Sequence, residues 1–153
     1  EALVPAAYLG GAIRALDTAA EFARSVDLPD GTRLADLDGA KVELGRMTIQ
    51  LKAAVGLVPQ IGAALAALDS DPLRSVEAFT DAASVAKYTS TRTAEEIVQG
   101  VRRFIGTRSM VPNAIVSELS QQVIFGPLHP KLSATVERGF GDRTLSLGSF
   151  LGL

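Results

Sequence analysis

Apolar residues recur every three or four positions through most of the chain, the spacing that gathers them on one face of an α-helix. The first such run extends from Pro5 to Val26, and its charged residues lie off the apolar stripe. A turn that contains Pro29 and Gly31 ends this helix. The stripe itself consists of Leu9, Ile13, Leu16, Ala20, Ala23 and Val26.

A second helix is expected to begin near Ala35 or Asp36 and to stop at residues 69–71. Pro59 lies inside its pattern and must kink or break it, because a proline removes one ladder hydrogen bond and clashes with the preceding turn. The run between Lys52 and Asp69 carries no charge, yet it is shorter than the roughly 20 residues of a membrane-spanning helix. We therefore expect this run to be a buried helix.

A third helix is predicted from Pro72 to about Ile105, since proline suits a first helical turn and Gly106 is typical of a helix end. Residues 111–113 open a fourth helix, which ends at 126–127. A short fifth piece covers 130–139. Residues 141–153 show no clear period, so we expect a tail that is loose or bound to a partner.

Long helices joined by short turns favour antiparallel neighbours. The pattern therefore predicts an all-α fold, an antiparallel four-helix bundle with a short fifth helix, over residues 1–140, followed by a C-terminal tail over 141–153. The chain has 153 residues and is 47% hydrophobic, which suffices for one core. Its aromatic share is only 5%, and the abundance of Ala and Leu favours helices over sheets.

Composition also narrows the classes of function. The net charge of -2 offers no basic field for nucleic acid. With no Cys and one His, the chain has no thiolate chemistry, and we expect no metal site. We find no secretory pattern and expect a cytoplasmic protein without a membrane anchor. Because the chain starts at Glu1 rather than Met, we expect a piece of a longer protein or a processed start.

Two features remain open between a structural and a functional interpretation. The first is the pair Arg102-Arg103 beside Gly106, where cations either complement the helix dipole or contact an anion such as phosphate. The second is His129 in the sequence Gly-Pro-Leu-His-Pro, which is either a structural turn residue or a group that exchanges a proton near neutral pH. By contrast, Gly10-Gly11 lies in a helical pattern and suits a helix crossing.

Three segments, in order, resemble the C-terminal helical domain of acyl-CoA dehydrogenases. Residues 86–94 match the family pattern A-K-x-x-x-(S/T)-x-x-A. Residues 9–24 are similar to L-G-x-A…A-x-x-Y-A-x-x-R, and residues 33–42 resemble P-(I/L)-A-D-F-Q-A-V. The likeness covers roughly residues 1–130.

In that family the domain is the last third of a flavoenzyme and packs against copies of itself. The resemblance implies FAD as cofactor of the intact enzyme and an acyl-CoA thioester as substrate, in fatty acid or lipid metabolism. The reaction removes the hydrogens α and β to the thioester carbonyl, with FAD taking a hydride. The implied partners are identical subunits or a related acyl-CoA dehydrogenase subunit.

The family's cofactor contacts are changed in this chain. The arginine that contacts the flavin diphosphate falls on Asp27, and the glutamine before the Gly-Gly pair falls on Arg103. The Gly-Gly pair reads Gly106-Thr107. We take Arg103 and Gly106 as candidate cofactor-binding residues, because a guanidinium is a bidentate donor for a diphosphate.

The catalytic positions are changed as well. The usual catalytic glutamate falls near Pro130, which takes no proton. One subfamily carries its glutamate at the start of the first helix, where this chain has Glu1. His129 lies eight residues after Gln121, at the place of the catalytic base in flavin monooxygenases of the same fold. Glu1 and His129 are therefore the candidate catalytic residues.

Three hypotheses about function follow. The leading one is the C-terminal bundle of an acyl-CoA dehydrogenase-like flavoprotein, either catalytic or the degenerate half of a heteromeric enzyme that no longer binds flavin. The alternatives are a flavin-dependent monooxygenase of the same fold and a non-catalytic helical scaffold.

Overall fold

The computed structural model describes residues 3–110, 114–129 and 132–147. Within these ranges the structure consists of helices joined by turns and short irregular segments, with one isolated antiparallel bridge between Asp27 and Arg33. The α-helices are α1 (Val4–Ser25), α2 (Asp38–Val55), α3 (Val58–Ser70), α4 (Pro72–Ile105), α5 (Ile115–Val123) and α6 (Ser133–Leu147). Short 3-10 turns, η1 (Leu34–Asp36), η2 (Gly106–Met110) and η3 (Gly126–Leu128), join some of them.

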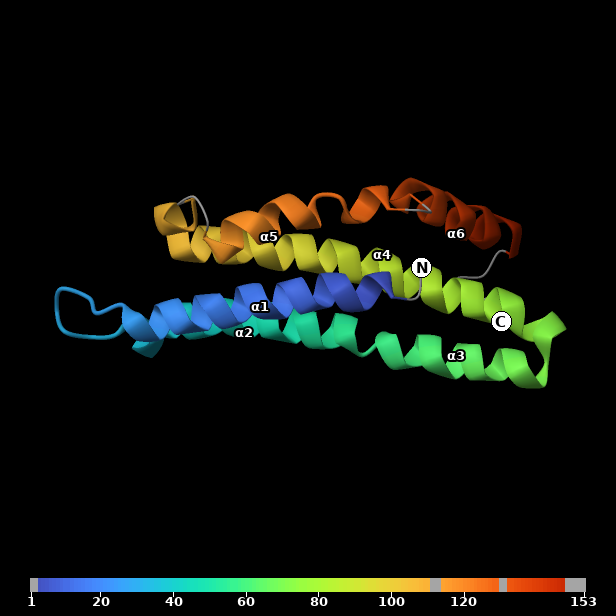
Figure 1. Ribbon diagram of the computed structural model, residues 1–153, viewed down its shortest axis with the longest axis horizontal. Helices are drawn as coiled ribbons and strands as arrows, with labels where there is room; N and C mark the ends of the chain where they lie inside the picture. Colours follow the sequence, from blue (N-terminus) through green and yellow to red (C-terminus); the bar gives the residue numbers. More distant parts are fainter. Residues whose placement is uncertain (1–2, 111–113, 130–131, 148–153) are drawn as a thin grey trace.

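The helices form four rods that lie side by side with alternating direction (Figure 1). One rod is α1, and another is α4. The remaining two rods are each made of two helices placed end to end, α2 with α3 and α5 with α6. The predicted all-α antiparallel four-helix bundle is confirmed.

Small side chains allow the central rods to approach closely. Ala12, Ala15 and Ala19 of α1 are completely buried on its inner face. A Cβ atom added at Gly100 of α4 would lie 2.8 Å from Sδ of Met47 in α2, so glycine lets the Met47 side chain pack directly against α4 at this crossing. Ala and Gly thus replace aromatic residues in the core, which explains the low aromatic content.

The second predicted helix is interrupted where the proline required it. The helical hydrogen bonds of α2 end at Val55, and α3 starts at Val58. Pro59 lies in the first turn of α3, where a missing N–H costs little. The break between Val55 and Val58 confirms the predicted effect of Pro59. The start of α2 differs slightly from the expected one, because η1 precedes it and the α-helix begins at Asp38.

The prediction that the uncharged run forms a buried helix is wrong. Among the α3 side chains that the structure describes, only Ile61 is buried, and Leu65 is 51% exposed. The rod from Asp38 to Leu68 is long and apolar enough to cross a membrane by length and composition alone. Its most apolar 18-residue window has a mean hydropathy of 1.6, and 17% of that window is buried. Soluble core helices pass the same test. The physical reason for the exposure is position, because α3 is the end of an outer rod.

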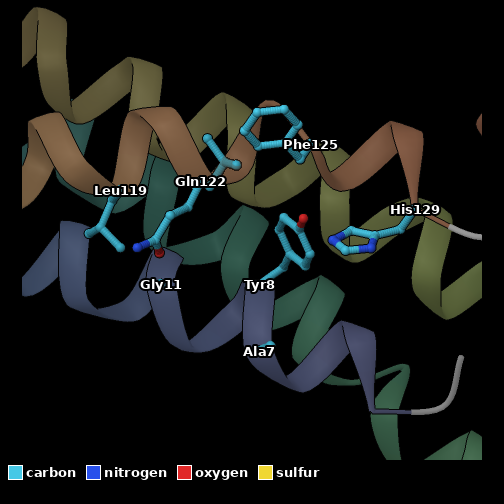
Figure 2. A pocket seen from close by; sticks show the side chains of 8 residues that line it. Ala7, Tyr8, Gly11, Leu119, Gln122, Phe125 and His129 are labelled. Atoms are coloured by element: carbon cyan, nitrogen blue, oxygen red, sulfur yellow. The ribbon is translucent and has the colours of Figure 1, made fainter.

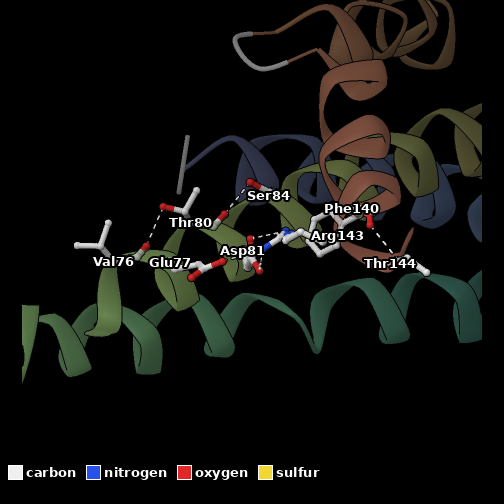
Figure 3. Close-up of polar contacts among 8 residues, drawn as sticks. All are labelled: Val76, Glu77, Thr80, Asp81, Ser84, Phe140, Arg143 and Thr144. Carbon is white, nitrogen blue, oxygen red and sulfur yellow. Dashed lines mark hydrogen bonds and ion pairs between the residues drawn. The ribbon is translucent and has the colours of Figure 1, made fainter. Parts of the chain in front are cut away.

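The predicted end of the last helix at Gly139 is also wrong, because α6 continues across Gly139 and Gly141 to Leu147. Contacts with α4 override the cost of two helical glycines, about 1 kcal/mol each. Arg143 donates to both carboxylate oxygens of Asp81 at 2.6 and 2.8 Å, and to Glu77 at 3.3 Å (Figure 3). The expected irregular tail therefore does not begin at Gly141, because residues 141–147 are helical. The division of the chain into a domain over 1–140 and a tail over 141–153 stays a prediction. Residues 148–153 lie outside the described residues.

Candidate functional site

A cavity among the described residues lies between α1 and the α5–η3 segment. Its volume is about 420 Å³, within the usual range for a small-molecule site. We call it the α1–α5 pocket. It is lined by Ala7, Tyr8, Gly11, Leu119, Gln122, Val123, Phe125 and His129.

The pocket has an apolar floor and an exposed rim. Leu119 and Val123 form the floor and are buried in the bundle. Phe125 is 56% exposed at the rim, where His129 and Gln122 are exposed as well. Figure 2 shows the three rings of Tyr8, Phe125 and His129 grouped toward one end, and Leu119, Gly11 and Gln122 toward the other.

Tyr8 and His129 bring their rings together across the pocket wall. The ring centroids are 5.6 Å apart and the planes are inclined at 79°, an edge-to-face arrangement (Figure 2). Burial raises the pKa of the Tyr8 phenol above its usual value. The backbone N–H of His129 donates to the carbonyl of Gly126 at 3.3 Å, so η3 fixes the backbone that carries the imidazole.

Gly126 explains how this turn fits against the bundle. A Cβ atom at this position would lie 2.8 Å from Cβ of Thr91 in α4 and 2.9 Å from Cε1 of Tyr8 in α1. Thr91 directs its hydroxyl to the carbonyl of Lys87, at 3.0 Å, and presents carbon atoms to Gly126. Only glycine therefore allows α1, α4 and η3 to meet here.

The described lining of the pocket is neutral. None of the described residues that line it is an acid, a lysine or an arginine. Within the described ranges, the Tyr8 hydroxyl, the Gln122 side-chain amide and the His129 imidazole make no hydrogen bond or ion pair. These three groups are thus available to a ligand.

A second cavity of about 300 Å³ lies at the C-terminal end of α4. Gly106 ends that helix with a φ of +71°, a left-handed conformation that suits glycine. The Ser109 hydroxyl donates to the Gly106 carbonyl at 2.7 Å, which ties η2 to the helix end. The cavity is lined by Gln99, Arg102, Arg103, Gly106, Ser109 and Met110.

Two arginines make this second cavity cationic. Arg103 is exposed, and Arg102 is half-buried and donates to Oε1 of Gln99 at 3.4 Å. The pKa of the Glu43 carboxyl is lowered mainly by its hydrogen bond to Arg46, with smaller contributions that include the charge of Arg103. A guanidinium pair at a cavity suits an anion, and it also complements the negative end of the helix dipole.

The structure separates the sequence-predicted site residues into two places. His129 lies in the α1–α5 pocket, whereas Arg103 and Gly106 lie together in the α4-end cavity. Arg103 follows Thr91, the α4 residue beside the pocket, by twelve positions, which is roughly 18 Å along a helix. Glu1 lies outside the described residues.

Sequence reasoning missed Tyr8, Phe125 and the steric role of Gly126. Gly126 had been interpreted only as a helix end, and Tyr8 is not part of the apolar stripe assigned to the first helix. The available signal was an aromatic residue among small ones in residues 6–12, a pattern that leaves space beside a helix.

Comparison with known proteins supports the fold and the family. Residues 2–124 match the model for the acyl-CoA dehydrogenase C-terminal domain. No curated protein sequence matches the chain. Two solved structures of nitroalkane oxidase, one of the S276A mutant crystallised with 1-nitrohexane, share 23% identity at a TM-score of 0.80. The matched region covers 97% of this chain and 34% of each nitroalkane oxidase chain.

An electron transferring flavoprotein structure from Acidaminococcus fermentans is also similar, with 18% identity and a TM-score of 0.74. The matched region covers 88% of this chain and 33% of the flavoprotein chain. At these identities the structural likeness shows the fold alone, and the chain spans about a third of the length of the proteins it resembles. The family model, however, matches well over half of the chain. The chain therefore belongs to the acyl-CoA dehydrogenase family, as its C-terminal domain.

Proposed function

We propose that this chain is the C-terminal bundle of an acyl-CoA dehydrogenase-like flavoprotein and that the α1–α5 pocket is its share of the substrate site. The observation that carries the proposal is the pocket itself, a cavity of about 420 Å³ in the family-matched bundle whose described lining residues include no acid, lysine or arginine. Six of its lining residues, from Ala7 to Val123, fall within the matched residues 2–124.

In the proposed reaction an acyl-CoA thioester loses two hydrogens, α and β to its carbonyl. FAD, when bound, supplies the hydride acceptor. The pocket residues of this protein hold the acyl group of the substrate against Leu119 and Val123 and exclude water from it. Glu1 is the proposed acceptor of the α proton, on the sequence resemblance alone.

The residues at the end of α4 fit the anionic part of such a cofactor. Arg103 would donate to a diphosphate, and Gly106 would permit close approach because it has no side chain. Asp27, at the family's arginine position, instead forms an ion pair with Arg33 at 3.7 Å. The loss of the family's arginine at position 27 weakens the expected hold on a diphosphate, which supports the variant of the proposal in which this chain is the degenerate half of a heteromeric enzyme.

A second candidate is a flavin-dependent monooxygenase of the same fold. It is favoured by the position of His129, whose imidazole lies in the pocket beside Tyr8 without a hydrogen bond within the described ranges. In this alternative His129 takes a proton from the substrate near neutral pH. A non-catalytic scaffold is the third candidate, and it requires neither His129 nor Arg103 for its function.

Two variants of the full-length protein separate these candidates. For a dehydrogenase, Arg103→Ala weakens flavin retention and His129→Ala has little effect. For a monooxygenase, His129→Ala lowers turnover by about 10²–10⁴ while flavin stays bound. Arg138→Ala, an exposed cation on α6, is the matched control. Unchanged flavin retention and turnover in both site variants would leave only the scaffold.

We further propose that the bundle associates with a second copy or a related subunit through its α2–α3 rod. Large apolar side chains are exposed along this rod, and monomeric proteins rarely leave such surfaces uncovered. The exposed residues are Val42, Ile49, Val55 and Leu65. A cytoplasmic location and a role in lipid metabolism are proposed from the family resemblance and composition.

A further inference from the structure

We propose that Gly11 sets the depth of the α1–α5 pocket and thereby selects the length of an uncharged apolar ligand that this chain binds. The inference rests on the proposed function only in taking this pocket as the substrate site. Binding of the ligand itself requires no flavin, so the two can be tested separately.

The ligand must be uncharged where it enters the pocket. The floor residues Leu119 and Val123 are apolar and buried, and none of the lining residues that the structure describes carries a permanent charge. A carboxylate or phosphate moved into this cavity would lose its hydration without gaining a cation. The cationic cavity at Arg103 lies roughly 18 Å away along α4 and is too distant to compensate.

One end of the pocket supplies hydrogen bonds to one neutral polar group. The Tyr8 hydroxyl and the His129 imidazole both lie at that end (Figure 2), and neither makes a hydrogen bond within the described part of the chain. An alcohol, amide or carbonyl oxygen matches these donors and acceptors. The ligand is thus an apolar chain with a neutral polar end.

Gly11 lies where a side chain would shorten the pocket. A Cβ atom added there would be 3.4 Å from Cδ2 of Leu119, an ordinary contact across the floor between α1 and α5. Any atoms beyond Cβ would occupy the space that the ligand needs. Gly10, the preceding residue, is exposed and would place its Cβ in open space, with nothing within 4 Å.

The test uses 1-alkanols from butanol to decanol, added to the 153-residue chain. Binding is followed through the imidazole proton resonances of His129, which are unambiguous because the chain has a single histidine. Each added methylene is expected to tighten binding about fourfold, the equivalent of ~0.8 kcal/mol, until the chain reaches the floor. Beyond that length the affinity stays level.

Gly11→Leu is expected to move this plateau to a shorter alkanol, and Gly11→Ala to move it less in the same direction. Gly10→Leu, the matched control on the same helix, keeps the wild-type dependence. Since the Cβ of Gly11→Ala meets Leu119 at an ordinary distance, this variant is expected to fold. An unchanged plateau in Gly11→Ala and Gly11→Leu would overturn the proposal.

Octanoate provides the comparison for charge. At a pH where it is ionised, we expect it to bind at least tenfold more weakly than 1-octanol. Equal binding of the two, or no perturbation of His129 by any alkanol, would contradict the inference. A full-length protein that binds no flavin or does not turn over acyl-CoA would instead contradict the proposed function. The alkanol result would remain valid in that case.

Discussion

The imidazole of His129 meets the phenol ring of Tyr8 edge to face, with the centroids 5.6 Å apart. These residues are far apart in the sequence, and a single turn of chain at Gly126 brings them together. The α1–α5 pocket therefore depends on a contact between the first helix and the segment after α5.

Gly126→Ala is expected to destabilise the fold. The added methyl group would lie 2.8 Å from Thr91 Cβ and 2.9 Å from Tyr8 Cε1, so buried carbon atoms must move. Overpacking of this kind costs about 1–3 kcal/mol, measurable by urea denaturation. Gly139→Ala in α6 meets nothing within 4 Å and should be neutral or stabilising. Equal stability of the two variants would argue against the close contact.

Alkaline titration should report the burial of Tyr8. Its pKa is raised by desolvation, so the neutral phenol is favoured in the folded chain. The stability that it contributes is present below the unfolded pKa of about 10 and is lost as the pH rises through the higher folded value. In Tyr88→Phe, which leaves Tyr8 as the one tyrosine, the absorbance midpoint should exceed 10. A midpoint at or below 10 would contradict the burial of Tyr8.

Arg143→Gln is expected to loosen α6 from α4. The variant removes a two-pronged ion pair with Asp81, together with the contact to Glu77. Because these groups are partly exposed, the loss in unfolding free energy should be only about 1 kcal/mol. Hydrogen exchange along residues 133–147 should accelerate, whereas Arg138→Gln on the same helix should not change it. Unaltered exchange in Arg143→Gln would show that other contacts hold α6.

The exposed side of α3 should mediate association. Leu65→Glu places a charge on this apolar surface and is expected to shift the full-length protein toward smaller species in light scattering. Gln60→Glu adds the same charge at an exposed polar position of the same helix and should leave association unchanged. A clean monomer for the wild-type protein at tens of micromolar would contradict the proposed association.

Local patterning accounts for much of the architecture but not for its surfaces. The limits of α4, from Pro72 to Ile105, follow from a proline at the start and Gly106 at the end. The periodicity could not place α3, because an apolar stretch of Ala and Leu fits either a core or an outer rod. Likewise, Gly139 and Gly141 suggested an end to α6 that its contacts with α4 together override, among them the ion pair between Arg143 and Asp81.

The candidate site could be foreseen only in part. His129 could be identified because it is the single histidine of the chain. Arg103 and Gly106 could be identified because a glycine after a helix and arginines in its last turn are typical of a helix end. Tyr8 and Gly126 could not be identified, since their roles depend on a contact between distant segments. A single sequence shows which residues share a helix face but not which face meets a given turn.

The most direct test of the proposed function is an anaerobic titration of the full-length protein, purified with any partner chain, with a series of acyl-CoA thioesters. We expect bound flavin to lose its yellow absorbance on addition of the substrate, and Arg103→Ala to retain less flavin than Arg138→Ala. A flavin-loaded protein whose absorbance no acyl-CoA alters, or a full-length protein that holds no flavin with any partner, would contradict the proposal.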